Sequence, residues 1–323
     1  MDSSVFHFCV GFVLVTLFAA TSRGQSVVDV NPGQTIPNNV TIANGTTVNV
    51  NGGTIGLGVN LTSGTLNINS GEVAIGAASI FSGFENTNNI VNVTGGEVGG
   101  FFQLRGGTEL SLTGGMLTSF GVFTGSTAIL TGGSVSRFPD VFNTGTVSIS
   151  GGEVFSIRAF DGATVNLFGS NFALNGIPIN GLMPGEAFTI ANRNVTLTTT
   201  LVDGSILETD LDTSFGSFSG PNPDGAASNA TITATLVLPG DFDFDSDVDG
   251  SDFLAFQRGD NPFLPQTAAA LTVFEDNFGN NFGSLQSLSV PEPTSAAICL
   301  LAGMTMLITP CRRQKLSSTG IIL

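Results

Sequence analysis

The chain has 323 residues, of which 41% are hydrophobic, and its formal net charge is −16 at pH 7. Residues 25–290 contain five arginines, no lysine and no histidine against 23 acidic residues, and this balance argues against nucleic acid as a partner, because phosphate contacts require cationic side chains. The three cysteines lie only in the two terminal segments, at Cys9, Cys299 and Cys311, so the segment between them has no thiol for a disulfide, a metal or nucleophilic catalysis.

Residues 1–24 have the pattern of a secretory signal peptide. An apolar stretch from Phe8 to Ala20 is followed by small residues suited to cleavage near Ser22 or Gly24. An uncleaved N-terminal anchor is the alternative. That stretch is short for a membrane-spanning helix, which takes about 20 apolar residues, so we expect export.

Residues 25–174 contain a repeat that predicts a parallel β-helix. Units such as TTVNVNGGTI, GTLNINSGEV and GTVSISGGEV recur, and their central pair of small residues returns every 18 or 19 residues, with one interval of 25. Such a period is typical of a solenoid, in which stacked units bury an apolar face that one unit cannot bury alone. We therefore expect a mainly β fold with about seven coils of 18–19 residues. A β-sandwich with glycine turns, the alternative, would not need equivalent residues to recur on one fixed period.

Three apolar columns run through this repeat at fixed distances from the Gly pair. Four residues before the pair stand Val48, Leu66, Val91, Leu110, Ala128, Val147 and Val165. Two residues before it stand Val50, Ile68, Val93, Leu112, Leu130, Ile149 and Leu167, and three residues after its first member stand Ile55, Val73, Val98, Leu117, Val135, Val154 and Phe172. The residue between the first two columns is mostly polar, and this alternation predicts a strand with one buried face. The Gly pair then turns the chain, because glycine readily adopts positive φ angles.

After residue 174 the alternation continues without the period. We interpret residues 175–238 as a β-rich cap, because an open solenoid end would expose unpaired strand edges. The sequence GSFSGPNPDG (216–225) is expected to be a loop within this cap.

Residues 239–283 begin with GDFDFDSDVDGSDF (240–253), an acidic stretch without a single cation. Counted from Asp241, carboxylates occupy positions one, three, five, seven, nine and twelve, at Asp241, Asp243, Asp245, Asp247, Asp249 and Asp252. Alternating oxygen ligands with a closing carboxylate at a helix start suit Ca²⁺, a hard cation with 6–8 oxygen ligands. Position seven would bind through its backbone carbonyl, leaving the Asp247 side chain free to point outward. A disordered acidic linker is the alternative.

Two short helices are expected after this loop. The first begins at Asp252, with Phe253 and Phe256 able to face a core. The second lies within residues 266–279 and has Leu271, Phe274 and Phe278 on one side. Together with the loop they form a small helical module.

The loop and its first helix resemble one calcium-binding half of a type I dockerin. Dockerins pair two loop–helix repeats and bind cohesin domains in carbohydrate-degrading assemblies. The resemblance implies Ca²⁺ at the aspartates and a cohesin-like protein as a candidate partner. This chain departs from the family in two ways: Ser246 stands where the family has glycine, and no second aspartate loop precedes the second helix.

After a linker at 284–290, the C-terminal segment reads VPEPTSAAICLLAGMTMLITPCRRQK. A Pro-Glu-Pro triplet, an apolar run and a basic cluster (Arg312, Arg313, Lys315) follow in that order. Residues 291–315 thereby resemble the PEP-CTERM sorting signal of Gram-negative bacteria. The resemblance implies processing by an exosortase-type membrane protease and delivery to the cell surface or extracellular matrix, although the added tail SSTGIIL departs from the pattern. Without the resemblance, residues 296–310 are expected to be a short transmembrane anchor with its basic end in the cytoplasm.

The whole sequence predicts an exported, non-enzymatic protein with a structural or adhesive role, associated with exopolysaccharide at the cell surface. The alternatives are a β-helix polysaccharide lyase or glycosidase carrying a dockerin-like module, and a cohesin-dependent scaffold component. Hydrolysis needs two carboxylates about 5–10 Å apart, and lyase chemistry needs a base near a neutralised acid. The charged residues of the solenoid form no such cluster in the sequence: Glu72, Glu97, Arg105, Glu109, Arg137, Asp140, Glu153, Arg158 and Asp161.

Overall fold

The computed structural model describes residues 26–42, 44–73, 88–214, 225–261, 266 and 268–280. The expected signal peptide (1–24), the linker (284–290) and the expected sorting signal (291–315) with its apolar segment (296–310) lie outside these residues. The protein is mainly β, with 50% strand and 8% helix. Within the described part of the chain, none of the helices combines the length and the apolar composition required to cross a bilayer.

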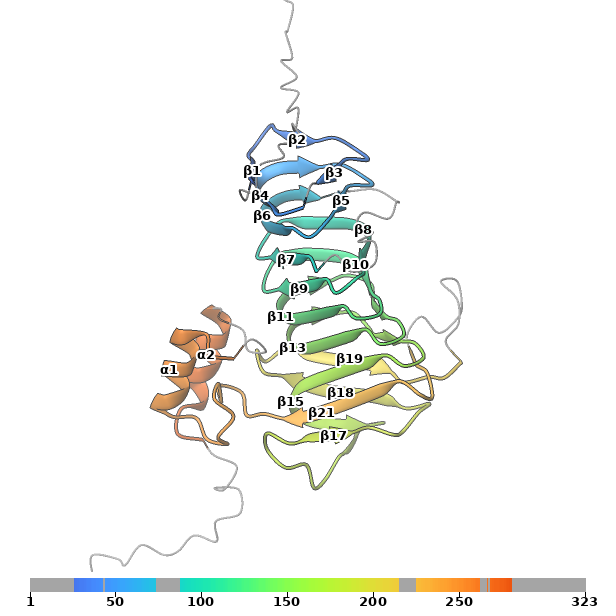
Figure 1. Cartoon of the computed structure of the whole chain (residues 1–323). Helices are drawn as coiled ribbons and strands as arrows, with labels where there is room; N and C mark the ends of the chain where they lie inside the picture. Colours follow the sequence, from blue (N-terminus) through green and yellow to red (C-terminus); the bar gives the residue numbers. More distant parts are fainter. Residues whose placement is uncertain are drawn as a thin grey trace, which may run out of the picture. The chain divides into compact units, whose positions relative to one another are not determined.

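The strands form a parallel β-solenoid of about 7 turns, as the repeat predicts (Figure 1). One face is built by strands that pair in parallel from rung to rung: β1 (Ser26–Val30), β4 (Thr46–Ile55), β6 (Thr65–Val73), β7 (Ile90–Val93), β9 (Glu109–Leu112), β11 (Thr127–Val135), β13 (Thr146–Val154) and β15 (Thr164–Leu174). Other faces contain β2 (Thr35–Ile36), β3 (Thr41–Ile42), β5 (Asn60–Leu61), β8 (Glu97–Leu104), β10 (Met116–Val122), β12 (Pro139–Val141) and β14 (Arg158–Ala159).

The three apolar columns predicted from the repeat belong to the core of the solenoid. Leu66 lies opposite Val48 and Ile68 opposite Val50 in the register of β4 and β6, and equivalent pairs continue into β15. Every member of the three columns is buried, with at most 7% of its surface exposed. The predicted alternation between core and solvent is therefore confirmed.

Asparagine side chains between the buried columns bond to one another along the outside of the solenoid. Nδ2 of Asn67 donates to Oδ1 of Asn49 at 2.8 Å, and Nδ2 of Asn92 donates to Oδ1 of Asn67 at 2.9 Å. Asn49 in turn donates to Oδ1 of Asp29 at 2.8 Å. This amide ladder adds side-chain hydrogen bonds to the backbone bonds between successive coils.

In the coil that contains Gly114 and Gly115, both residues of the Gly pair are tightly constrained at the corner, for different reasons. The second residue, such as Gly115, has a positive φ of +74°. A Cβ added at Gly115 would lie 2.7 Å from the backbone carbon of Gly95, and one added at Gly114 would lie 2.4 Å from the carbonyl oxygen of Thr94. The backbone of the preceding coil therefore occupies the space that a side chain would need.

Replacing Gly115 by alanine is expected to lower the free energy of unfolding by about 2–3 kcal/mol, because the positive φ alone costs an L-residue about 1–2 kcal/mol and the Cβ also meets fixed backbone. Gly125→Ala is the matched control, since Gly125 has a similar φ of +76° with nothing within 4 Å of the added Cβ. Urea denaturation followed by far-UV circular dichroism compares the two. Equal losses would contradict the steric role of the corner.

The segment expected to form a cap, 175–238, has two parts. β20 (Gly225–Ala226) pairs in parallel with β14 and β21 (Thr231–Leu236) with β15, so they extend the solenoid by one rung. The part of the segment before β20 pairs antiparallel and consists of β16 (Ile177–Pro178), β17 (Ala187–Thr189), β18 (Thr196–Leu201) and β19 (Ile206–Asp210). The sequence did not predict the added rung because no Gly pair follows β21.

Two helices, α1 (Gly250–Arg258) and α2 (Ala268–Asn277), follow the solenoid. α1 starts two residues before the predicted Asp252 and ends at Arg258, and the following Gly259, with a φ of +66°, is its C-cap. The aspartate loop and the two helices pack around a small hydrophobic core, which they share with the residues that follow β18 and β21. Its buried members are Val202, Val237, Phe242, Val248, Ala255, Ala270 and Phe274. Phe256 packs against this core as expected, whereas Phe253 and Phe278 are 37% and 62% exposed.

Candidate metal centre

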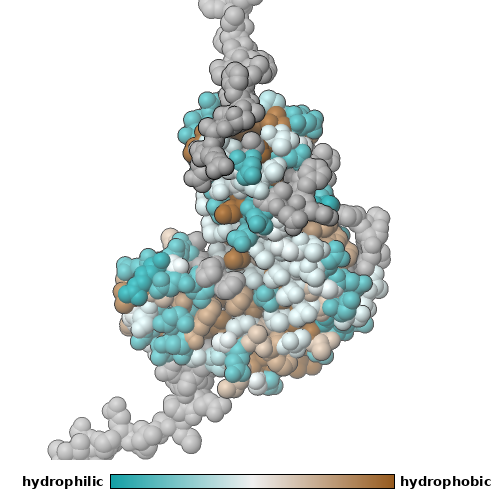
Figure 2. Space-filling view, viewed as in Figure 1, coloured by the Kyte–Doolittle hydropathy of each residue, from teal (hydrophilic) through white to brown (hydrophobic). Residues whose placement is uncertain are grey.

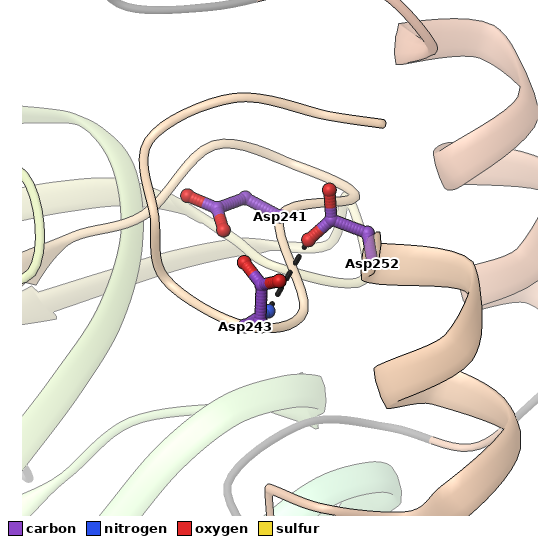
Figure 3. A group of neighbouring side chains, drawn as sticks. All are labelled: Asp241, Asp243 and Asp252. Carbon is purple, nitrogen blue, oxygen red and sulfur yellow. Dashed lines mark hydrogen bonds between the residues drawn. The ribbon is translucent and has the colours of Figure 1, made fainter. Parts of the chain in front are cut away.

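The aspartates of the loop converge on the first turn of α1. Figure 3 shows the carboxylates of Asp241, Asp243 and Asp252 close together, and one oxygen from each lies within 4.8 Å of the others. Asp245, Asp247 and Asp252 form a second group of this kind. Asp252 belongs to both groups, so its carboxylate is the centre of the acidic cluster.

Backbone hydrogen bonds fix the position of Asp252, which is fully buried. Its Oδ1 accepts from the N–H of Phe242 at 2.5 Å and from the N–H of Asp243 at 3.2 Å, and its Oδ2 accepts from the N–H of Asp249 at 2.7 Å. The last aspartate of the loop therefore closes the loop onto its own start. Val248 adds a second closure, because its N–H donates to the carbonyl oxygen of Asn280 at 2.8 Å and its own carbonyl accepts from Gly279 at 2.7 Å.

Two of the six aspartates have positions that the sequence did not indicate. Asp249 is the N-cap of α1: its Oδ1 accepts from the N–H of Ser251 at 2.6 Å, and it belongs to neither carboxylate group. Asp247 was expected to point outward, but its Oδ1 is buried and its carboxylate lies with those of Asp245 and Asp252. The loop turns at Ser246, the residue before Asp247, where φ is +82°.

The electrostatics of the cluster are unfavourable without a cation. Burial, and then the charge of Asp252, raises the pKa of Asp241 to about 7 and that of Asp243 to about 6. Asp241 is 2% exposed, and its Oδ1 has no hydrogen-bond partner. In the described part of the chain, the salt bridges are Asp140–Arg158 and Asp260–Arg258, and neither involves the cluster.

This donor set fits a hard divalent cation. All side-chain ligands are carboxylate oxygens, which Ca²⁺ prefers. The buried, unpartnered Oδ1 of Asp241 is an independent indication, because a buried carboxylate oxygen normally has a donor or a cation beside it. The arrangement is therefore chemically suited to binding a cation.

In the absence of divalent cations, the helical module is expected to be less stable at pH 8 than at pH 5. The pKa of Asp241 is about 7 in the folded protein and about 3.9 in an unfolded chain. The folded state thus binds more protons between these values, and stability falls as pH rises through them, by on the order of 2 kcal/mol. Urea titrations followed by the amide NMR signals of α1 and α2 measure this. Greater stability at pH 8 would contradict the burial of Asp241.

A different acid–base pair lies in the solenoid. Arg158 donates from Nε to Oδ1 of Asp140 at 2.5 Å and from Nη2 to Oδ2 at 2.6 Å, with both side chains buried. The guanidinium carbon also lies 4.2 Å from the centre of the Phe138 ring. The sequence did not reveal this pair, because Asp140 and Arg158 stand at different distances from their Gly pairs. Paired residues are 19 positions apart at the end of β11 and β13 (Val135 and Val154) but 18 apart in β12 and β14, and this change of register after β13 brings Asp140 and Arg158 together.

Comparisons with known proteins provide no relative on which to base a function. No family model, curated protein or solved structure matches this chain. The resemblances to type I dockerins and to PEP-CTERM signals therefore depend on the motif residues in the sequence alone.

Proposed function

We propose that this chain is an exported, non-enzymatic protein of the cell surface or extracellular matrix, and that its helical module binds Ca²⁺ through the aspartate loop (241–252). One observation carries the calcium proposal: Asp241 is buried beside Asp243 and Asp252, with an oxygen that has no partner. Leaving like charges buried and unpaired would cost several kcal/mol. A bound cation removes that cost. Asp245, Asp247 and Asp249 complete the predicted ligand loop, with Asp249 also capping α1.

The outer face of the solenoid supports a structural or adhesive role in contact with exopolysaccharide. The residues between the first two buried columns are uncharged and mostly polar: Asn49, Asn67, Asn92, Ser111, Ile129, Ser148 and Asn166. All of them except the buried Ser148 are partly exposed. Figure 2 shows a largely pale and teal surface over the solenoid, with few strongly hydrophobic residues. Hydroxyl and amide groups in regular rows suit a hydroxyl-rich polymer. Asp140 and Arg158, by contrast, are buried and bonded to each other.

The terminal segments complete the proposal. The signal-peptide pattern and the resemblance of residues 291–315 to a PEP-CTERM signal support export, processing by an exosortase-type protease and transient attachment to the membrane. The dockerin resemblance supports a cohesin-like protein as a further partner, and only one of the two loops that dockerins use is present.

Residues 25–290 provide the test, because all the described strands and helices belong to one compact unit. Calorimetric titration with Ca²⁺ and with Mg²⁺ is expected to show one Ca²⁺ site. Sedimentation with neutral and acidic polysaccharides, with Ca²⁺ or a chelator, then records bound protein and released reducing ends. Binding without sugar release is the expected result. Release of sugar would replace the matrix role by an enzymatic one, and absence of Ca²⁺ binding would overturn the calcium site.

A further inference from the structure

The aspartate loop also has an apolar side. Phe242 and Phe244 alternate with the aspartates in the sequence. The ring of Phe242 is part of the hydrophobic core of the module and that of Phe244 packs against it, whereas the carboxylates form the acidic cluster around Asp252. The ring centre of Phe242 lies 5.1 Å from that of Phe256 in α1 and 6.2 Å from that of Phe274 in α2. One short segment therefore carries both the acidic cluster and the contacts that hold the two helices.

Phe244 extends these contacts to the solenoid. Its ring stacks on Phe168 of β15, with centroids 6.2 Å apart and planes inclined by 4°. The backbone of Phe244 has a φ of +64°, which few residues other than glycine adopt. The loop conformation that brings the aspartates together thus also directs this ring towards the solenoid.

A second contact joins the module to the β18–β19 turn. Val202 is buried in the same core as Phe274, and a Cβ added at Gly204 would lie 3.7 Å from Cγ2 of Val273. The turn itself is fixed to a solenoid corner, because Oδ2 of Asp203 accepts from the N–H of Gly152 at 2.6 Å. The core of the module therefore includes a residue of the β18–β19 turn, and this turn is hydrogen-bonded to the solenoid.

We propose that the aspartate loop is a calcium-dependent clamp, in which a cation on its acidic side holds Phe244 against Phe168 and so fixes the helical module to the C-terminal end of the solenoid. This proposal rests on the Ca²⁺ site proposed above. Without a cation, carboxylates within 4.8 Å of one another repel, and spreading of the loop moves Phe244 away from β15. Thermodynamic linkage makes this coupling reciprocal. If Ca²⁺ strengthens the stacking contact by a given factor, the contact strengthens Ca²⁺ binding by the same factor.

The absence of Trp and Tyr from the chain allows a single tryptophan to report on this contact. Phe168→Trp places the reporter on the solenoid and leaves all six aspartates intact. Its emission is expected to shift to the blue on addition of Ca²⁺, with the midpoint found by calorimetry. Phe155→Trp is the control, because Phe155 is a solenoid phenylalanine that is 65% exposed, and its emission should not change.

Phe244→Ala tests the linkage in the other direction. It should weaken Ca²⁺ binding by about 3- to 10-fold, the range expected for loss of one aromatic pair, and abolish the shift in the Phe168→Trp background. Phe278→Ala, at a 62% exposed position of the same module, should leave the affinity unchanged. Calcium binding by calorimetry without an emission change, or with full affinity in Phe244→Ala, would overturn the clamp and leave the Ca²⁺ site standing. If neither heat nor a shift appears, both proposals fail.

Discussion

Asp252→Asn is expected to lower the affinity for Ca²⁺ by on the order of 100-fold, which corresponds to about 2.7 kcal/mol. The reason is that Asp252 belongs to both carboxylate groups and accepts three backbone N–H bonds that close the loop. An asparagine keeps the shape but removes the charge and presents an NH₂ group to those donors or to the ion. Calorimetric titration gives the affinity directly.

The same variant should lose most of its stabilisation by Ca²⁺. At a concentration 100 times the wild-type dissociation constant, binding stabilises the wild type by about 2.7 kcal/mol and the variant by less than about 0.5 kcal/mol. Asp260→Asn is the control, because it makes the same change of charge at an exposed residue after α1, beside Arg258. If both variants bound Ca²⁺ equally, the cluster around Asp252 would not be the binding site.

Arg158→Met is expected to lower the free energy of unfolding by about 3–5 kcal/mol, because it leaves the carboxylate of Asp140 buried without its partner. Asp140 is fully buried, and burial raises its pKa against the opposing effect of the Arg158 guanidinium. Methionine retains much of the length of arginine, so the lost charge and hydrogen bonds account for most of the effect. Urea denaturation followed by circular dichroism measures it.

The double variant Asp140→Leu/Arg158→Met separates charge from packing. Replacing both partners by apolar groups removes the unpaired charge, so its stability should return to within about 1–2 kcal/mol of the wild type. A double variant as unstable as the single one would show that packing around the pair, and not the uncompensated carboxylate, causes the loss. A single variant with wild-type stability would contradict the burial of Asp140.

The sequence by itself determined the solenoid. Apolar residues equivalent to Val48, Val50 and Ile55 return in each later coil at the same distances from the Gly pair. Such a repeat requires stacking, because one unit alone cannot bury its apolar face. The order of the six aspartates likewise predicted that carboxylates gather before a helix, as they do, and their binding of a cation stays a prediction. Both inferences depend on regular spacing along the sequence, because alternation shows which side of a strand is buried and the longer period shows that the strands stack.

Tertiary structure alone decided the contacts between residues far apart in the chain. The pairing of Asp140 with Arg158 depends on a change of register between coils, and the added rung β21 depends on the return of the chain after the antiparallel strands. The start of α1 at Gly250 made Asp249 the N-cap and placed Asp252 in the first turn of the helix. The stacking of Phe244 on Phe168 depends on where the loop meets β15. Periodicity fixes which side a residue faces, but the partner it meets there is set by register and by the path of the chain.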